Sequence, residues 1–129
     1  MPGRVLLDTT VIISLFSHDP AVRSQLDTAA EVFVPSIAIG ELFYGAYKSR
    51  QAEQNVETIR RFTQANTILA ADSHTAEVYG QVKSRLRERG RPIPENDIWI
   101  AAIALQHALE LAARDIHFAE VEGLSVLAW

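Results

Sequence analysis

The 129-residue sequence contains no cysteine. This absence excludes disulfide bridges, cysteine nucleophiles and thiolate zinc sites, so any site chemistry must use oxygen or imidazole groups. The chain also lacks an uninterrupted apolar run of about 18 residues, the length that a membrane-spanning helix needs. Its first residues hold no apolar stretch of the kind found in a secretion signal. We therefore expect a cytoplasmic protein with no membrane partner.

Basic residues are fewer than acidic ones, and glycine-rich phosphate loops are missing. The chain has 12 Lys and Arg against 16 Asp and Glu, a formal net charge of −4. This balance argues against a generally basic nucleic-acid-binding surface but allows a local basic patch. No Gly-x-Gly-x-x-Gly and no Gly-Lys-Ser/Thr loop occurs, so nothing supports a nucleotide cofactor. The length predicts a single domain over residues 1–129.

Short apolar runs alternate with helical patterns along the chain. The expected strands are residues 5–7, 31–35, 67–70, 110–113 and 124–127, and the expected helices are residues 11–16, 21–30, 36–49, 51–66, 73–89 and 98–109. Strands that alternate with helices favour a mostly parallel sheet that is covered on both faces. The sequence therefore predicts an α/β fold with a mostly parallel central sheet.

Four carboxylates stand where such a fold would bring them together. Asp8 follows the first expected strand and Asp115 follows the fourth. Glu41 lies on an apolar face of the helix at 36–49, and Asp97 lies at the start of the most apolar helix. The carboxyl ends of parallel strands meet at one edge of a sheet, so these acids are expected to converge. Several buried carboxylates need a compensating cation, and Mg²⁺ or Mn²⁺ at such a site would promote phosphodiester hydrolysis.

Each acid also has an ordinary structural explanation. Asp8 and Asp115 can cap turns or helices, and Asp97 can complement a helix dipole from the first turn. Glu41 has no capping role that would explain an inward position. The structural explanation is therefore weakest for Glu41, and weaker for the four acids together than for any one of them.

Several basic side chains are possible contacts to a phosphate backbone. Arg85, Arg89 and Arg91 fall near the end of the long helix, where they can contact phosphates or simply stabilise the helix dipole. Lys48 lies seven residues after Glu41 and so near the same helical face. It can contact a substrate phosphate or extend into solvent along the surface.

The aromatic and histidine residues are predicted to be structural. Tyr44 and Tyr47 are expected to pack on their helix rather than to stack on bases. The four histidines show no spacing of the zinc-protease type, so we expect local structural roles and no catalytic task for them.

Four segments together resemble the PIN-domain ribonucleases, in particular the VapC-type toxins of bacterial toxin–antitoxin pairs. The segments are, in chain order, LLDTTVII, PSIAIGELFYGAYKS, PIPENDIWIAAIAL and LAARDIHFAEVEGLSV. The resemblance covers almost the whole chain and implies a three-layer α/β/α sandwich. It also implies a metal-dependent endoribonuclease with an RNA substrate, which forms a homodimer and is inhibited by a small cognate VapB-type antitoxin.

The resemblance also assigns roles to individual residues. The implied acidic cluster, which would hold Mg²⁺ or Mn²⁺, is Asp8, Glu41, Asp97 and Asp115. Thr9 matches a hydroxyl position beside this cluster. The chain departs from the family at Thr10, where asparagine is frequent, and at Ala113, where Thr or Ser is frequent. Both departures would remove hydrogen-bond partners of the acids.

Three other functions stay open at the level of sequence. A catalytically weak PIN-like binding module would use the acidic pocket for a partner's Arg or Lys. An aspartyl-phosphate phosphotransferase would use Asp8 as its nucleophile, but that chemistry needs a second aspartate where this chain has Thr10. A phosphate-accepting receiver would need a lysine late in the sheet, and no lysine follows Arg91.

Overall fold

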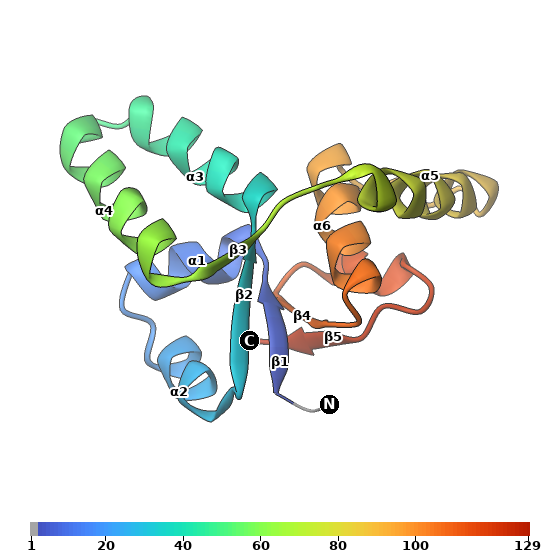
Figure 1. Cartoon of the computed structure of the whole chain (residues 1–129), viewed down its shortest axis with the longest axis horizontal. Helices are drawn as coiled ribbons and strands as arrows, with labels where there is room; N and C mark the ends of the chain where they lie inside the picture. Colours follow the sequence, from blue (N-terminus) through green and yellow to red (C-terminus); the bar gives the residue numbers. More distant parts are fainter. Residues whose placement is uncertain (1–2) are drawn as a thin grey trace.

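A computed structural model describes residues 3–129 of the chain as a five-stranded sheet with helices on both sides (Figure 1). The strands are β1 (Arg4–Leu7), β2 (Glu31–Pro35), β3 (Thr67–Leu69), β4 (Glu110–Ala113) and β5 (Val126–Ala128). Their order in the sheet is β3-β2-β1-β4-β5, and every pair of neighbouring strands is parallel. The predicted α/β class is confirmed, with β1 in the centre of the sheet.

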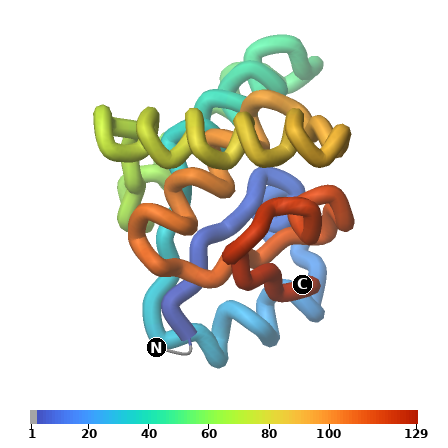
Figure 2. The backbone as a smooth tube through the Cα atoms, turned by 90° about the vertical axis from the view of Figure 1, so that its right-hand side faces the viewer, coloured from blue at the N-terminus to red at the C-terminus, as the bar shows by residue number. Residues whose placement is uncertain are grey.

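Six α-helices and one short 3₁₀ helix connect the strands. They are α1 (Thr9–Phe16), α2 (Pro20–Thr28), α3 (Ser36–Tyr47), α4 (Ala52–Ala65), α5 (Ser73–Glu88), α6 (Glu95–Gln106) and η1 (Ile116–Glu120). The first four α-helices cover one face of the sheet, and α5 and α6 cover the other (Figure 1). Figure 2 shows α5 crossing α6 on the outside of this second layer.

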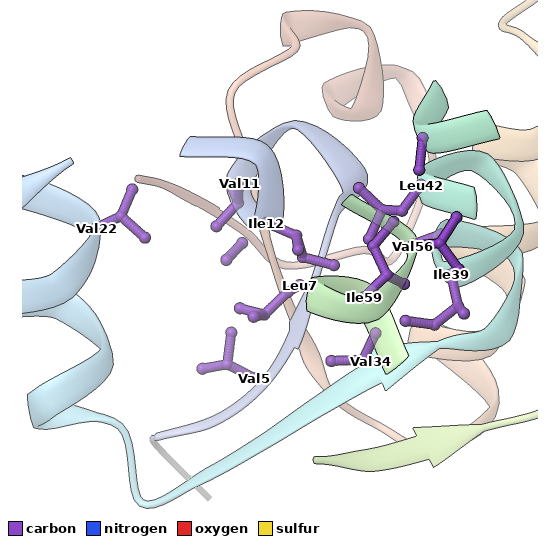
Figure 3. Close-up of a cluster of buried hydrophobic side chains, with 13 residues drawn as sticks. Val5, Leu7, Val11, Ile12, Val22, Val34, Ile39, Leu42, Val56 and Ile59 are labelled. Carbon is purple, nitrogen blue, oxygen red and sulfur yellow. The ribbon is translucent and has the colours of Figure 1, made fainter. Parts of the chain in front are cut away.

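Side chains along the central strands point alternately to the two faces of the sheet, and this divides the core into two parts. Val5 and Leu7 of β1 pack with the buried side chains of α1 to α4, as Figure 3 shows, whereas Leu6 packs with α5 and α6. Successive side chains of a strand point to opposite faces, so a strand buried on both faces has no polar position. The sheet therefore forms a rigid base whose carboxyl edge can hold polar groups.

The structure differs from the sequence prediction mainly around the fourth strand. Helix α6 begins at Glu95 and ends at Gln106, three residues earlier at each end than expected. The helix stops because the backbone turns at Ala108, which has a φ of 53°. As a result Asp97 lies inside the first helical turn. The 3₁₀ helix η1 was not predicted at all. In the described residues, no helix is long and apolar enough to cross a membrane.

Candidate active site

The four acids lie at the carboxyl edge of the sheet, and they line one pocket. Asp8 directly follows β1, and its backbone N–H donates to the Ala112 carbonyl of β4 at 2.9 Å. Asp115 follows β4, while Glu41 comes from α3 and Asp97 from α6. All four line a cavity of about 510 Å³. Neither Asp8 nor Asp115 makes a side-chain capping hydrogen bond to the helix that follows it, so capping does not explain them.

Asp8 is the most buried of the four acids, with 2 % of its surface exposed. The pKa of Asp8 is raised from 3.8 to about 6, chiefly by burial and to a smaller extent by the negative charges of Asp97 and Asp115. The hydroxyl of Thr10 donates to Asp8 Oδ2 at 3.0 Å and opposes this shift. The expected loss of a hydrogen-bond partner at position 10 is therefore wrong, because the threonine hydroxyl reaches the carboxylate itself. Ala113 is buried in the core and offers the site only a methyl group.

Asp97 has a partner that the sequence analysis missed. The Nε2 atom of His117, on η1, lies 2.7 Å from Asp97 Oδ2. Burial raises the pKa of Asp97, and the charges of Glu41 and Asp115 act in the same direction, whereas His117 lowers it. The sequence analysis expected a local structural role for all four histidines and did not anticipate that His117 contacts a site acid. The available signal was its place two residues after Asp115, on a segment with no predicted element.

Glu41 is held from a second helix. The hydroxyl of Thr9, the first residue of α1, donates to Glu41 Oε1 at 2.8 Å. This bond joins the beginning of α1 to the middle of α3 across 32 positions of sequence. The predicted place of Thr9 beside the acids is therefore what the structure shows, and its hydroxyl fixes the direction of the glutamate.

The arrangement of donors fits a divalent cation. One oxygen of Asp97, one of Asp115 and one ring nitrogen of His117 lie within 4.8 Å of one another. Glu95 also lines the pocket and is paired with Lys83, but in the described part of the chain none of the four acids has a Lys or Arg partner. Oxygen-rich donor sets of this kind suit Mg²⁺ and Mn²⁺, and an imidazole suits Mn²⁺ better than Mg²⁺. Asp8 and Glu41 lie outside the three-residue group but face the same pocket.

Comparison with known proteins places this site in a family. The sequence model of the PIN domain matches residues 5–124. The chain belongs to the PIN domain family. Ribonuclease VapC2 of Haemophilus influenzae is 34 % identical to it over 129 residues, with 98 % of each chain covered. The tRNA(fMet)-specific endonuclease VapC of Shigella flexneri is 30 % identical, with 98 % of each chain covered.

Solved structures agree with this membership. VapBC2 of Rickettsia felis, bound to a DNA fragment from its promoter, superposes with a TM-score of 0.88 at 25 % identity, covering 97 % of this chain and 98 % of the other. DNA-bound VapBC of Salmonella typhimurium gives a TM-score of 0.89 at 26 % identity, covering 96 % of both chains. The predicted resemblance and the predicted three-layer PIN fold are therefore confirmed.

The arginines considered as phosphate contacts lie apart from the acids of the PIN domain. The guanidinium of Arg89 donates to the Glu120 carbonyl at 2.8 Å, and Arg91 lies 4.0 Å from the Glu120 carboxylate. Arg85 lies in the last turn of α5. None of the three lines the acidic pocket. Their contact with RNA stays a prediction, and the ion pairs with Glu120 supply a structural role for two of them.

The tyrosines of α3 contact neighbours on their own helix, as predicted, but their rings are exposed to solvent and are not part of the core. Tyr44 is 68 % exposed and Tyr47 is 63 % exposed. The reason is that α3 buries a different set of side chains, namely Ala38, Ile39, Leu42 and Ala46. Tyr47 stacks on Phe43, with ring centres 6.3 Å apart. Above the ring of Tyr44 lies the ammonium of Lys48, 4.7 Å from the ring centre.

Proposed function

We propose that this PIN domain is a metal-dependent endoribonuclease and the toxin of a VapBC-type toxin–antitoxin pair. The observation that carries the proposal is the group of four carboxylates around one pocket, two of them with raised pKa values and none with a lysine or arginine partner there. A protein that buries uncompensated carboxylates loses stability, so such a group indicates a cationic ligand. Family membership and relatives that are called ribonucleases support the same conclusion.

Each side chain has a role in this proposal. Asp8, Asp97 and Asp115 would hold Mg²⁺ or Mn²⁺, and Glu41 would complete the set or orient the attacking water. When bound, such an ion polarises a phosphoryl oxygen and makes a water molecule a better nucleophile. The hydroxyl of Thr9 fixes the direction of Glu41, whose carboxylate can then accept a proton from that water.

The decisive test is RNA cleavage by the purified chain. Cellular RNA is expected to be cut in the presence of Mg²⁺ or Mn²⁺ and to stay intact with EDTA, and sequencing of the fragment ends would identify the cut sites. Asp97→Asn is expected to abolish the cleavage because it removes a charge from the proposed ligand set. Cleavage that persists in EDTA and in Asp97→Asn would contradict the assignment.

The partners of the proposed toxin follow from the same site. We infer that it forms a homodimer and binds a small VapB-type antitoxin, since the similar solved structures are VapBC complexes. An acidic pocket without its own cation also suits an Arg or Lys of such a partner, which is the alternative of a catalytically weak binding module. Titration calorimetry separates the two, because a nuclease is expected to bind Mg²⁺ or Mn²⁺ specifically and a pure binding module is not.

An aspartyl-phosphate phosphotransferase is disfavoured by the burial of the proposed nucleophile. Only 2 % of the surface of Asp8 is exposed, and one carboxylate oxygen already accepts the Thr10 hydroxyl. A nucleophile needs an open path to the phosphoryl donor. We therefore assign Asp8 to ion binding.

Replacing His117 by alanine is expected to weaken metal binding and cleavage about 10- to 100-fold. The reason is that Asp97 would lose the group 2.7 Å from its Oδ2 atom, which fixes the orientation of the carboxylate. Metal affinity measured by calorimetry and the initial rate of cleavage are the two readouts. His117→Gln is expected to recover part of the loss, because an amide can donate to Asp97. His74→Ala, an exposed position on α5, is the matched control. Equal behaviour of the His117 and His74 variants would contradict this role.

A further inference from the structure

Asn96, in the first turn of α6, lines the same pocket as the four acids. Its side chain is exposed, and among residues 3–129 it takes part in no hydrogen bond. The two other asparagines of the chain both donate, one to the Ser49 hydroxyl and one to the Phe62 carbonyl. An exposed asparagine is ordinary, so its exposure alone means little. The donors around Asn96 are what give its position a meaning.

The pocket offers few side-chain donors to a ligand. Five of its lining side chains are carboxylates, which accept hydrogen bonds when ionised and donate none. The hydroxyls of Thr9 and Thr10 also line it, but they already donate to Glu41 and Asp8. A hydroxyl has a single hydrogen to donate, so both threonines are committed. Among the described residues that line the pocket, Asn96 is therefore the one whose side-chain N–H groups remain available to a ligand.

A phosphodiester in this pocket needs such a donor. The non-bridging oxygens of its phosphate carry negative charge, which the carboxylates repel and which grows when a water molecule attacks phosphorus. A Lys or Arg in place of Asn96 would pair with the carboxylates, as Lys83 does with Glu95, and would oppose the binding of a metal ion. A neutral amide can donate to the phosphate oxygen without this competition.

We propose that Asn96 is a further catalytic residue, whose side-chain amide donates to a non-bridging oxygen of the scissile phosphate. The hydrogen bond forms when RNA binds and strengthens during the attack, because the oxygen then carries more charge. The bond from water to phosphorus forms, the bond to the leaving ribose oxygen breaks, and that oxygen takes a proton from solvent. The amide itself neither gains nor loses a proton. This inference rests on the proposed ribonuclease function and adds a residue to it.

The test is cleavage of a short synthetic RNA that spans a cut site found with the purified wild-type chain, at saturating Mg²⁺ or Mn²⁺. Asn96→Ala is expected to lower kcat about 10- to 100-fold, the range for a hydrogen bond to a charged group, and to change KM less than about threefold. Asn96→Asp keeps the shape but loses the donors, so it is expected to lose at least as much. Asn96→Gln keeps the amide and is expected to recover part of the loss.

Two further readouts do not depend on turnover. The metal affinity of Asn96→Ala, measured by calorimetry, is expected to stay within about twofold of wild type, whereas a residue that supports the ion site would cost about 10- to 100-fold. In NMR spectra of the Asp8→Ala protein, which leaves the RNA intact, the same RNA is expected to shift the side-chain amide protons of Asn96. The amide protons of Asn55 and Asn66 are expected to keep their positions.

Asn55→Ala is the matched control, because Asn55 is an exposed asparagine on α4 that does not line the pocket. It is expected to cleave RNA as wild type does. The proposal is overturned if Asn96→Asp keeps the full kcat, or if RNA leaves the Asn96 amide resonances unchanged. It is also overturned if Asn96→Ala loses metal affinity as much as activity, which would make the side chain a support of the ion site.

Failure of this inference can be told from failure of the proposed function. If wild type cuts RNA and Asn96→Ala cuts it equally fast, the role of Asn96 is wrong and the proposed function stands. If wild type cuts no RNA with any divalent ion, the proposed function fails, and the role of Asn96 fails with it.

Discussion

Replacing Asp8 by asparagine is expected to abolish metal-stimulated RNA cleavage and, at the same time, to raise the melting temperature of the metal-free protein at pH 7. Cleavage is lost because the central carboxylate of the proposed ion site loses its charge. Stability rises because burial raises the pKa of Asp8 from 3.8 to about 6, so keeping it ionised at pH 7 costs the folded state about 2–3 kcal/mol. Asparagine has the same shape, and its side-chain oxygen can still accept the Thr10 hydroxyl.

The opposite signs of these two effects make the prediction specific. A variant that simply disturbed the fold would lose both activity and stability. Asp19→Asn serves as the control, because the Asp19 carboxylate accepts from Arg114 at 2.8 Å and this contact lowers the pKa of Asp19. Neutralising Asp19 is therefore expected to lower the melting temperature slightly and to leave cleavage unchanged. An Asp8→Asn protein that melts below wild type without metal would contradict the burial argument.

The stability gained from Mg²⁺ or Mn²⁺ is expected to depend steeply on pH. The folded-state pKa of Asp8 lies above its unfolded value, so the ionised carboxylate lowers the free energy of unfolding. This loss of stability is absent below about pH 4, grows between about pH 4 and 6, and is complete above pH 6. The raised pKa of Asp97 acts in the same direction. A bound cation needs ionised ligands and offsets their repulsion, so its stabilising effect should be small near pH 4 and full above pH 6.

Thermal denaturation with and without the metal measures this effect. At pH 7 and a metal concentration of about 100 times Kd, binding adds about 2.7 kcal/mol, which corresponds to a rise on the order of 10 °C for a chain of this size. The rise should vanish in Asp8→Asn and persist in Asp19→Asn. A metal-induced rise of equal size at pH 4 and pH 7 would show that the ion binds somewhere other than these carboxylates.

Much of the site was predictable from local pattern. A carboxylate that comes one or two residues after a buried strand, as Asp8 and Asp115 do, lies at the carboxyl edge of a parallel sheet wherever the strand lies. Periodicity also placed Glu41 and Asp97 on helices that begin near the same edge. The hydrogen bond from Thr9 to Glu41 joins two helices 32 positions apart, and no local pattern encodes it.

Two features of the site depended on packing between distant segments. His117 reaches Asp97 only because the short η1 helix turns back toward the start of α6. Tyr44 is exposed because α3 buries its other side against the neighbouring helices. The bond from Thr10 to Asp8 is local instead, because it spans two positions and depends on the backbone and side-chain conformation at the start of α1.

Local sequence pattern was enough to predict the fold class, the approximate elements and the four acids, because hydrophobic periodicity and strand ends are local properties of the chain. Packing in three dimensions set the contact of Thr9 with Glu41, the contact of His117 with Asp97 and the exposure of the Tyr44 ring. The physical reason is that a side chain's partner is set by distances between segments far apart in sequence, and these distances exist only once the two layers of helices have packed on the sheet.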